Sequence, residues 1–116
     1  MIAHVTAAAL LNECKVLAHP SSTDSVPTSG GKEDHVSMGM TGALKLKRVV
    51  ENLEAILAIE MLLGAQGLDY RAPLRPSAAV EAAHRTVRKL VPHLDEDRTP
   101  APDIVAIAGA IREGRF

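Results

Sequence analysis

The chain has almost no aromatic residues: its 116 residues include one tyrosine, one phenylalanine and no tryptophan. Aromatic residues make up 2% of the sequence although hydrophobic residues make up 47%, so the apolar content is mainly Ala, Leu, Val, Ile and Met. Sheets favour aromatic and β-branched residues, whereas Ala, Leu and Met favour helices. The composition therefore predicts an all-α protein.

Three further absences exclude other classes of protein. Cys14 is the single cysteine, so no internal disulfide can form, and we expect a cytoplasmic protein. The 13 basic and 14 acidic residues give a formal charge of -1, which predicts no binding to nucleic acid or to an anionic membrane. Charges interrupt the apolar stretches and no signal peptide is recognised, so we expect neither a membrane span nor secretion.

Apolar periodicity and turn signals predict four helices. They are expected over about residues 1–18, 33–66, 78–91 and 102–113. Proline or glycine lies close to each boundary after the start of the first helix, and both residues interrupt helices.

The expected helix over residues 33–66 is longer than a compact domain of this size. At a rise of about 1.5 Å per residue it would be about 50 Å long, whereas a compact domain of this length is roughly 35 Å across. Its second half, "AILAIEMLLGA", is apolar nearly all round. We therefore expect burial against protein outside these residues, by self-assembly or within a longer polypeptide.

A polar stretch at residues 25–39, "SVPTSGGKEDHVSMG", precedes this helix and permits several interpretations. Glu33 and Asp34 fit the first turn of a helix, where the helix dipole stabilises carboxylates. The segment "TSGGK" is similar to a phosphate loop, but the full G-x-x-x-x-G-K-[ST] pattern and a preceding strand are missing.

A metal site is a further interpretation, because the chain has five histidines. Glu81 and His84 lie three residues apart, and Glu33 lies near His35, but a zinc site needs three or four converging ligands. No zinc-binding motif occurs, so we expect no metal. Four histidines are instead expected at the surface or at helix ends: His4, His19, His84 and His93.

Taken as a whole, the stretch resembles the aromatic amino acid ammonia-lyases, and in particular the histidine ammonia-lyase branch. In that family a Pro-Thr-Ser loop leads into Gln-Glu-Asp-His-Val-Ser-Met and a long helix; here "PTS" is followed by "KEDHVSM" at residues 32–38. The flanking segments "TAAALLNECKVLAHP", "ENLEAILAIEMLLGAQGLDYR" and "DRTPAPDI" resemble the family in the same order. Glu-Asp-His is similar to the histidine branch, whereas the other branches usually carry Asn-Gln-Asp.

The resemblance implies that residues 1–116 are a single C-terminal helical segment of a larger homotetrameric lyase with a long-helix bundle. Such enzymes eliminate ammonia from an amino acid; in histidine catabolism, L-histidine gives urocanate. Their methylidene-imidazolone cofactor forms from an internal Ala-Ser-Gly, which this sequence does not contain. The resemblance thus implies a fragment that is inactive alone and needs the N-terminal remainder or a companion chain.

The resemblance also implies roles for two residues. Glu33 matches a glutamate at the substrate pocket and is expected to be catalytic or to bind the substrate, since a carboxylate can hold a cationic nitrogen. Lys32 stands where the family has glutamine and is expected to contact the substrate. The tripeptide at residues 28–30 is similar to the cyclising one but lies in a different loop, so it receives no cofactor role. A non-catalytic oligomerisation module, a remnant of the family, is the alternative.

Overall fold

The computed structural model describes residues 1–23 and 25–116. Within them it contains four α-helices and no strand, which confirms the all-α prediction. The helices are α1 (Ile2–Leu17), α2 (Gly39–Asp69), α3 (Ala78–Leu90) and α4 (Ala101–Arg112), and a 3-10 helix, η1, covers Ser29–Gly31.

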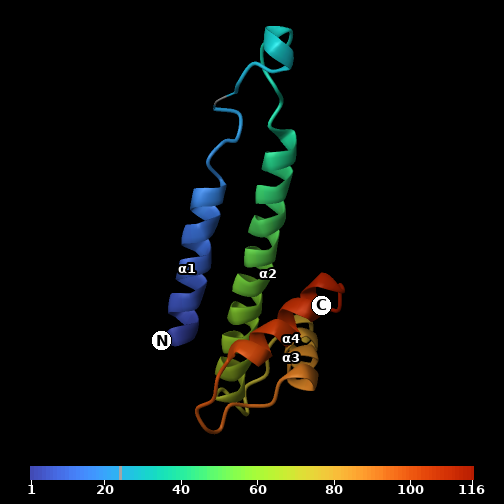
Figure 1. Ribbon diagram of the computed structural model, residues 1–116. Helices are drawn as coiled ribbons and strands as arrows, with labels where there is room; N and C mark the ends of the chain where they lie inside the picture. The colour runs from blue at the N-terminus through green and yellow to red at the C-terminus, as the bar shows by residue number, and fades with distance from the viewer. Residues whose placement is uncertain (24) are drawn as a thin grey trace.

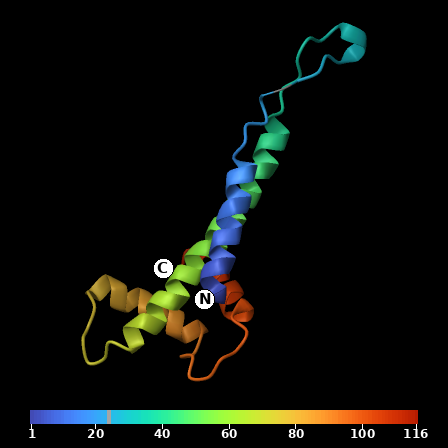
Figure 2. The same cartoon turned by 90° about the vertical axis from the view of Figure 1, so that its left-hand side faces the viewer.

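α2 is the axis of the molecule. α1 runs antiparallel along it, while α3 and α4 gather around its C-terminal end (Figures 1 and 2). The principal extents are 71 × 27 × 20 Å and the radius of gyration is 19.9 Å. A compact chain of this length would have a radius of gyration of about 13 Å. The chain is therefore a rod, with one end formed by the loop between α1 and α2.

The long helix is continuous, but it begins six residues later than the sequence pattern predicts. α2 starts at Gly39 and spans 31 residues, about 47 Å at the usual helical rise. The prediction that Glu33 and Asp34 lie in its first turn is wrong. Glu33 instead pairs with Thr28 in an isolated antiparallel bridge, so its backbone is extended rather than helical.

The core is small and lies where the C-terminal half of α2 meets α3 and α4. Ile107 of α4 is fully buried there, and burying such a side chain stabilises the fold by about 1.5–3 kcal/mol. The core cluster consists of Ala58, Ala65, Val87, Val91 and Ile107. Within the described residues, the buried core thus lies at one end of the rod.

α1 packs along α2 through half-buried side chains such as Ala7, Leu10 and Cys14, although none of its residues is fully buried. Polar contacts add to this packing. Glu13 accepts hydrogen bonds from Arg48 Nε at 3.2 Å and from Asn52 Nδ2 at 2.8 Å. These bonds, first of all that from Arg48, lower the pKa of the exposed Glu13 carboxyl. Asn52 is buried, so its amide is the inner part of this contact.

Much apolar surface stays exposed along the rod. In the second half of α2, Ala58 and Ile59 are buried while Leu57 and Leu63 are exposed. Large apolar side chains are also exposed on α1 and on the first half of α2: Ile2, Val5, Leu11, Val16, Leu44, Leu46 and Leu53. None of the helices in the described part of the chain has the length and apolar content needed to cross a membrane.

Candidate functional site

The polar stretch forms a hairpin at the end of the rod opposite α3 and α4, at the top of Figure 1. We call residues 25–36 the tip hairpin. Its base is closed by the Ser25 hydroxyl, which accepts a hydrogen bond from the Val36 N–H and donates one to the Val36 carbonyl, both at 2.9 Å. Two arms of the chain are thereby held side by side beyond the end of α2.

The turn of the tip hairpin uses left-handed backbone. The φ angles are 56° at Ser29, 67° at Gly30 and 82° at Gly31. Glycine adopts positive φ readily because it has no Cβ, whereas such a value is uncommon for serine. The Gly-Gly pair therefore reverses the chain direction here, so that Glu33 returns opposite Thr28.

Glu33 is held by Thr28 at three points. The Thr28 N–H donates to the Glu33 carbonyl at 3.0 Å, and the Glu33 N–H donates to the Thr28 carbonyl at 3.3 Å. The Thr28 hydroxyl also donates to Glu33 Oε2 at 2.8 Å. The carboxylate is exposed on this chain, so an external group can reach it.

Lys32, the second residue that the resemblance implies for the site, precedes Glu33 on the same turn. Its side chain is exposed, and its N–H donates to the Ser29 carbonyl at 3.4 Å. Asp34 and His35 follow Glu33 and are exposed as well. The hairpin thus gathers a cation, two carboxylates and an imidazole at one end of the rod.

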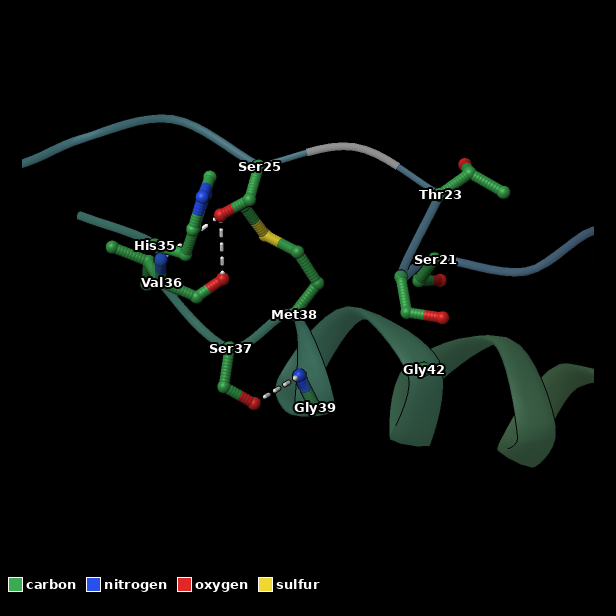
Figure 3. A pocket seen from close by; sticks show the side chains of 10 residues that line it. Ser21, Thr23, Ser25, His35, Val36, Ser37, Met38, Gly39 and Gly42 are labelled. Atoms are coloured by element: carbon green, nitrogen blue, oxygen red, sulfur yellow. Dashed lines mark hydrogen bonds between the residues drawn. The ribbon is translucent and has the colours of Figure 1, made fainter.

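A cleft of about 860 Å³ lies between the base of the tip hairpin and the first turn of α2. Figure 3 shows hydroxyl side chains around this turn, with Ser37 Oγ accepting a hydrogen bond from the Gly39 N–H at 3.3 Å. The lining residues are Ser21, Ser22, Thr23, Ser25, His35, Val36, Ser37, Met38, Gly39 and Gly42. Glu33 and Lys32 do not line the cleft, so the structure places them apart from it.

A polar cluster at the other end of the rod was not expected from the sequence. The carboxylate of Asp69, the last residue of α2, accepts hydrogen bonds from Arg88 Nη2 at 2.6 Å and Nε at 2.9 Å. It also lies 2.7 Å from His84 Nε2 and 2.7 Å from His93 Nδ1. Both histidines, which were expected at the surface or at helix ends, are half-buried.

The electrostatics of this cluster favour an ionised Asp69. Burial opposes ionisation, but hydrogen bonds from His93, Arg88 and His84 outweigh it and hold the pKa of Asp69 well below its usual range. Gln66 extends the cluster, since it donates to the Leu94 carbonyl and accepts from the Leu94 N–H, both at 3.1 Å. The cluster thus ties the end of α2 to α3 and to the segment that follows it.

The Asp69 cluster consists of hydrogen bonds and ion pairs within the chain. No group of three or more potential metal-binding side chains occurs among residues 1–23 and 25–116. Of Glu81 and His84, whose spacing was considered for a metal site, His84 places its Nε2 2.7 Å from Asp69 Oδ1. The sequence offered one signal: His84 and Arg88 lie four residues apart, on one face of a helix.

The fold and the tip hairpin define a class of helical lyases. The family model described as "Aromatic amino acid lyase" matches residues 1–89, most of the chain. The chain therefore belongs to the aromatic amino acid lyase family.

Within this family the chain is similar to histidine ammonia-lyases. It is 59% identical over 114 residues to histidine ammonia-lyase of Anaeromyxobacter sp. (strain K), with 98% of this chain and 22% of that protein covered. It is 52% identical over 116 residues to the enzyme of Myxococcus xanthus (strain DK1622), covering 100% of this chain and 23% of that protein. The chain thus spans less than a quarter of the length of these relatives.

Solved structures agree with the family assignment. The crystal structure of histidine ammonia-lyase from Trypanosoma cruzi superposes with a TM-score of 0.94 at 48% identity, over 99% of this chain and 23% of that one. The tyrosine aminomutase from Streptomyces globisporus superposes with a TM-score of 0.87 at 41% identity, over 97% and 21% of the two chains. The extended rod is therefore shared with segments of much longer proteins.

Proposed function

We propose that the chain is the C-terminal part of an enzyme that eliminates ammonia from L-histidine to give urocanate, with Glu33 at the substrate. The observation that carries this proposal is the tip hairpin: the "KEDHVSM" stretch folds so that an exposed Glu33 carboxylate has one oxygen already held by Thr28. The 59% identity to a histidine ammonia-lyase supports histidine as the substrate.

The chemistry requires groups of the kind that the hairpin carries. The β-proton of an amino acid is weakly acidic and ammonia is a poor leaving group, so the substrate must be held while a base acts. An ionised Glu33 can hold a cationic amino or imidazole nitrogen by a charge-assisted hydrogen bond. Lys32, beside it, supplies an ammonium that can bind an anionic group such as the substrate carboxylate.

The methylidene-imidazolone of the family cannot be formed by these residues. The sequence lacks Ala-Ser-Gly, and in the similar tripeptide at residues 28–30 the place of alanine is taken by Thr28, which is engaged with Glu33. We propose that an N-terminal remainder or a companion chain supplies this group, and that the 116 residues are inactive without it.

Assembly through long helices is part of the same proposal. Apolar side chains exposed along α1 and α2, such as Val5 and Leu46, favour burial against further helices. A homotetramer of the complete enzyme would supply these further helices. The single cysteine, Cys14, supports a cytoplasmic location for histidine catabolism.

The test grafts the 116 residues into the matching segment of histidine ammonia-lyase from Anaeromyxobacter sp. (strain K). The graft is expected to form urocanate from L-histidine, followed by the ultraviolet absorbance of the product. Glu33→Gln keeps the shape but removes the charge, and is expected to lower kcat/KM by about 100-fold. Glu96→Gln is the matched control, because Glu96 is an exposed glutamate in the segment after α3.

Two results would contradict the proposal. One is a folded graft that forms no urocanate while the parent enzyme remains active, which would favour a non-catalytic oligomerisation module. The other is an equal rate for Glu33→Gln and Glu96→Gln, which would remove Glu33 from the substrate site.

A further inference from the structure

Thr28 makes a contact with Glu33 that depends on its own side chain. The two backbone hydrogen bonds between these residues could be made by almost any pair of amino acids. The bond from the Thr28 hydroxyl to Glu33 Oε2, at 2.8 Å, requires a hydroxyl at this position. The contact therefore depends on the residue type at position 28, and the hairpin backbone alone would not make it.

The two partners differ in stiffness. Glutamate is a long side chain that populates many rotamers when exposed, as Glu33 is. Threonine is β-branched and restricted at χ1, and Thr28 is half-buried. The hydroxyl is therefore the better ordered partner, and the hydrogen bond limits the directions in which the Glu33 carboxylate points.

The hydrogen bond also distinguishes the two carboxylate oxygens. Oε2 receives the Thr28 hydroxyl, whereas Oε1 receives no hydrogen bond from the described residues, 1–23 and 25–116. A carboxylate has acceptor capacity on both oxygens. Oε1 is thus available to an external donor in a direction that the Oε2 contact helps to define.

We propose that Thr28 is a positioning residue for Glu33: its hydroxyl holds Oε2 so that Oε1 faces the cationic nitrogen of the amino acid substrate. The inference rests on the proposed function, since it assumes that Glu33 contacts the substrate. Thr28 itself acts through Glu33 and touches no reacting atom.

The test uses the same grafted enzyme with Thr28→Val and Thr28→Ser. Valine keeps the β-branch and the backbone bridge but lacks the donor, so KM for L-histidine is expected to rise about tenfold while kcat changes less than about twofold. Serine keeps the hydroxyl and is expected to restore KM to within about threefold of the parent graft. Thr86→Val is the matched control, because the Thr86 hydroxyl bonds only within α3, to the Ala82 carbonyl at 3.1 Å.

A double-mutant cycle separates positioning from a general effect on the hairpin. In the Glu33→Gln background the charged acceptor is gone, so Thr28→Val is expected to raise KM less than about threefold. A KM increase of the same size in both backgrounds would overturn the inference, because Thr28 would then act independently of the carboxylate. So would an unchanged KM in Thr28→Val, or a lowered melting temperature that Thr28→Ser does not restore.

The outcomes for the two proposals differ. If Glu33→Gln lowers kcat/KM but Thr28→Val leaves KM unchanged, the positioning role is lost and the proposed function stands. If Glu33→Gln has no effect, the role of Glu33 fails and the positioning role fails with it.

Discussion

Replacing Asp69 with asparagine tests whether the polar cluster holds the folded end of the rod together. The substitution keeps the size of the side chain but removes the charge that faces Arg88, His84 and His93. Asparagine retains one carbonyl oxygen, but its NH₂ group donates hydrogen bonds and would face other donors. The Arg88 guanidinium, which is 16% exposed, would lose its anionic partner.

The expected magnitude follows from this geometry. Hydrogen bonds between charged groups contribute about 1.5–3 kcal/mol each, and removing one partner of a buried ion pair costs about 3–5 kcal/mol. The Asp69 side chain is 20% exposed, so solvent compensates in part. We expect Asp69→Asn to lower the free energy of unfolding by about 2 kcal/mol.

The effect is expected to depend on pH with a defined sign. The pKa of Asp69 is lower in the folded chain than in the unfolded chain, where it is about 3.9. Its contribution is therefore complete above the unfolded pKa and is lost as pH falls through the lower folded value. The difference between wild type and Asp69→Asn is expected to be constant above about pH 5 and to shrink below about pH 4.

The assay is urea unfolding of the chain followed by circular dichroism, at a fixed protein concentration because self-association would shift the midpoint. Asp95→Asn is the control: its side chain is 87% exposed, and we expect a change within about 0.5 kcal/mol. Equal midpoints for the two variants at pH 7 would refute the reasoning. So would an Asp69→Asn difference that persists undiminished at pH 2.

Three further predictions follow from burial. Ile107→Ala removes a fully buried side chain and is expected to lower the free energy of unfolding by about 3 kcal/mol. Val105→Ala, at an exposed site of the same helix, is expected to change it little. Similar urea midpoints for the two variants would contradict this. The isolated 12.3 kDa chain is expected to self-associate in sedimentation experiments because of its exposed apolar surface, and a compact, cooperatively folding monomer would count against that view. Amide hydrogens of α1 are expected to exchange before those in the C-terminal half of α2, because α1 has no fully buried residue. Equal protection of the two helices would contradict this.

The sequence determined the helical class and the length of the central rod. Apolar residues without aromatics favour close helix packing, and prolines and glycines mark the helix boundaries other than the start of α2 within a few residues. The expected helix was longer than a compact domain of this size, and the structure has a continuous helix of 31 residues in a chain with a radius of gyration of 19.9 Å. Local propensity and chain geometry are sufficient for these properties because they involve neighbouring residues.

The sequence pattern did not predict where α2 starts. Glu33 and Asp34 have the residue type of a first helical turn, yet the helix begins only at Gly39. The competing structure is the hairpin, in which Ser25 binds the backbone of Val36 across eleven positions. A helix dipole stabilises a first-turn carboxylate by less than about 1 kcal/mol, so such a preference is readily overridden by tertiary contacts.

By itself, the sequence determined an all-α rod with a conspicuous "KEDHVSM" stretch before its main helix. Only the tertiary structure decided that Glu33 faces the hydroxyl of Thr28 and that Asp69 gathers Arg88 and two histidines. The physical reason is that hydrogen bonds between side chains depend on atoms brought within about 3 Å of each other by turns and helix packing. Residue types and spacings along the chain do not specify those distances.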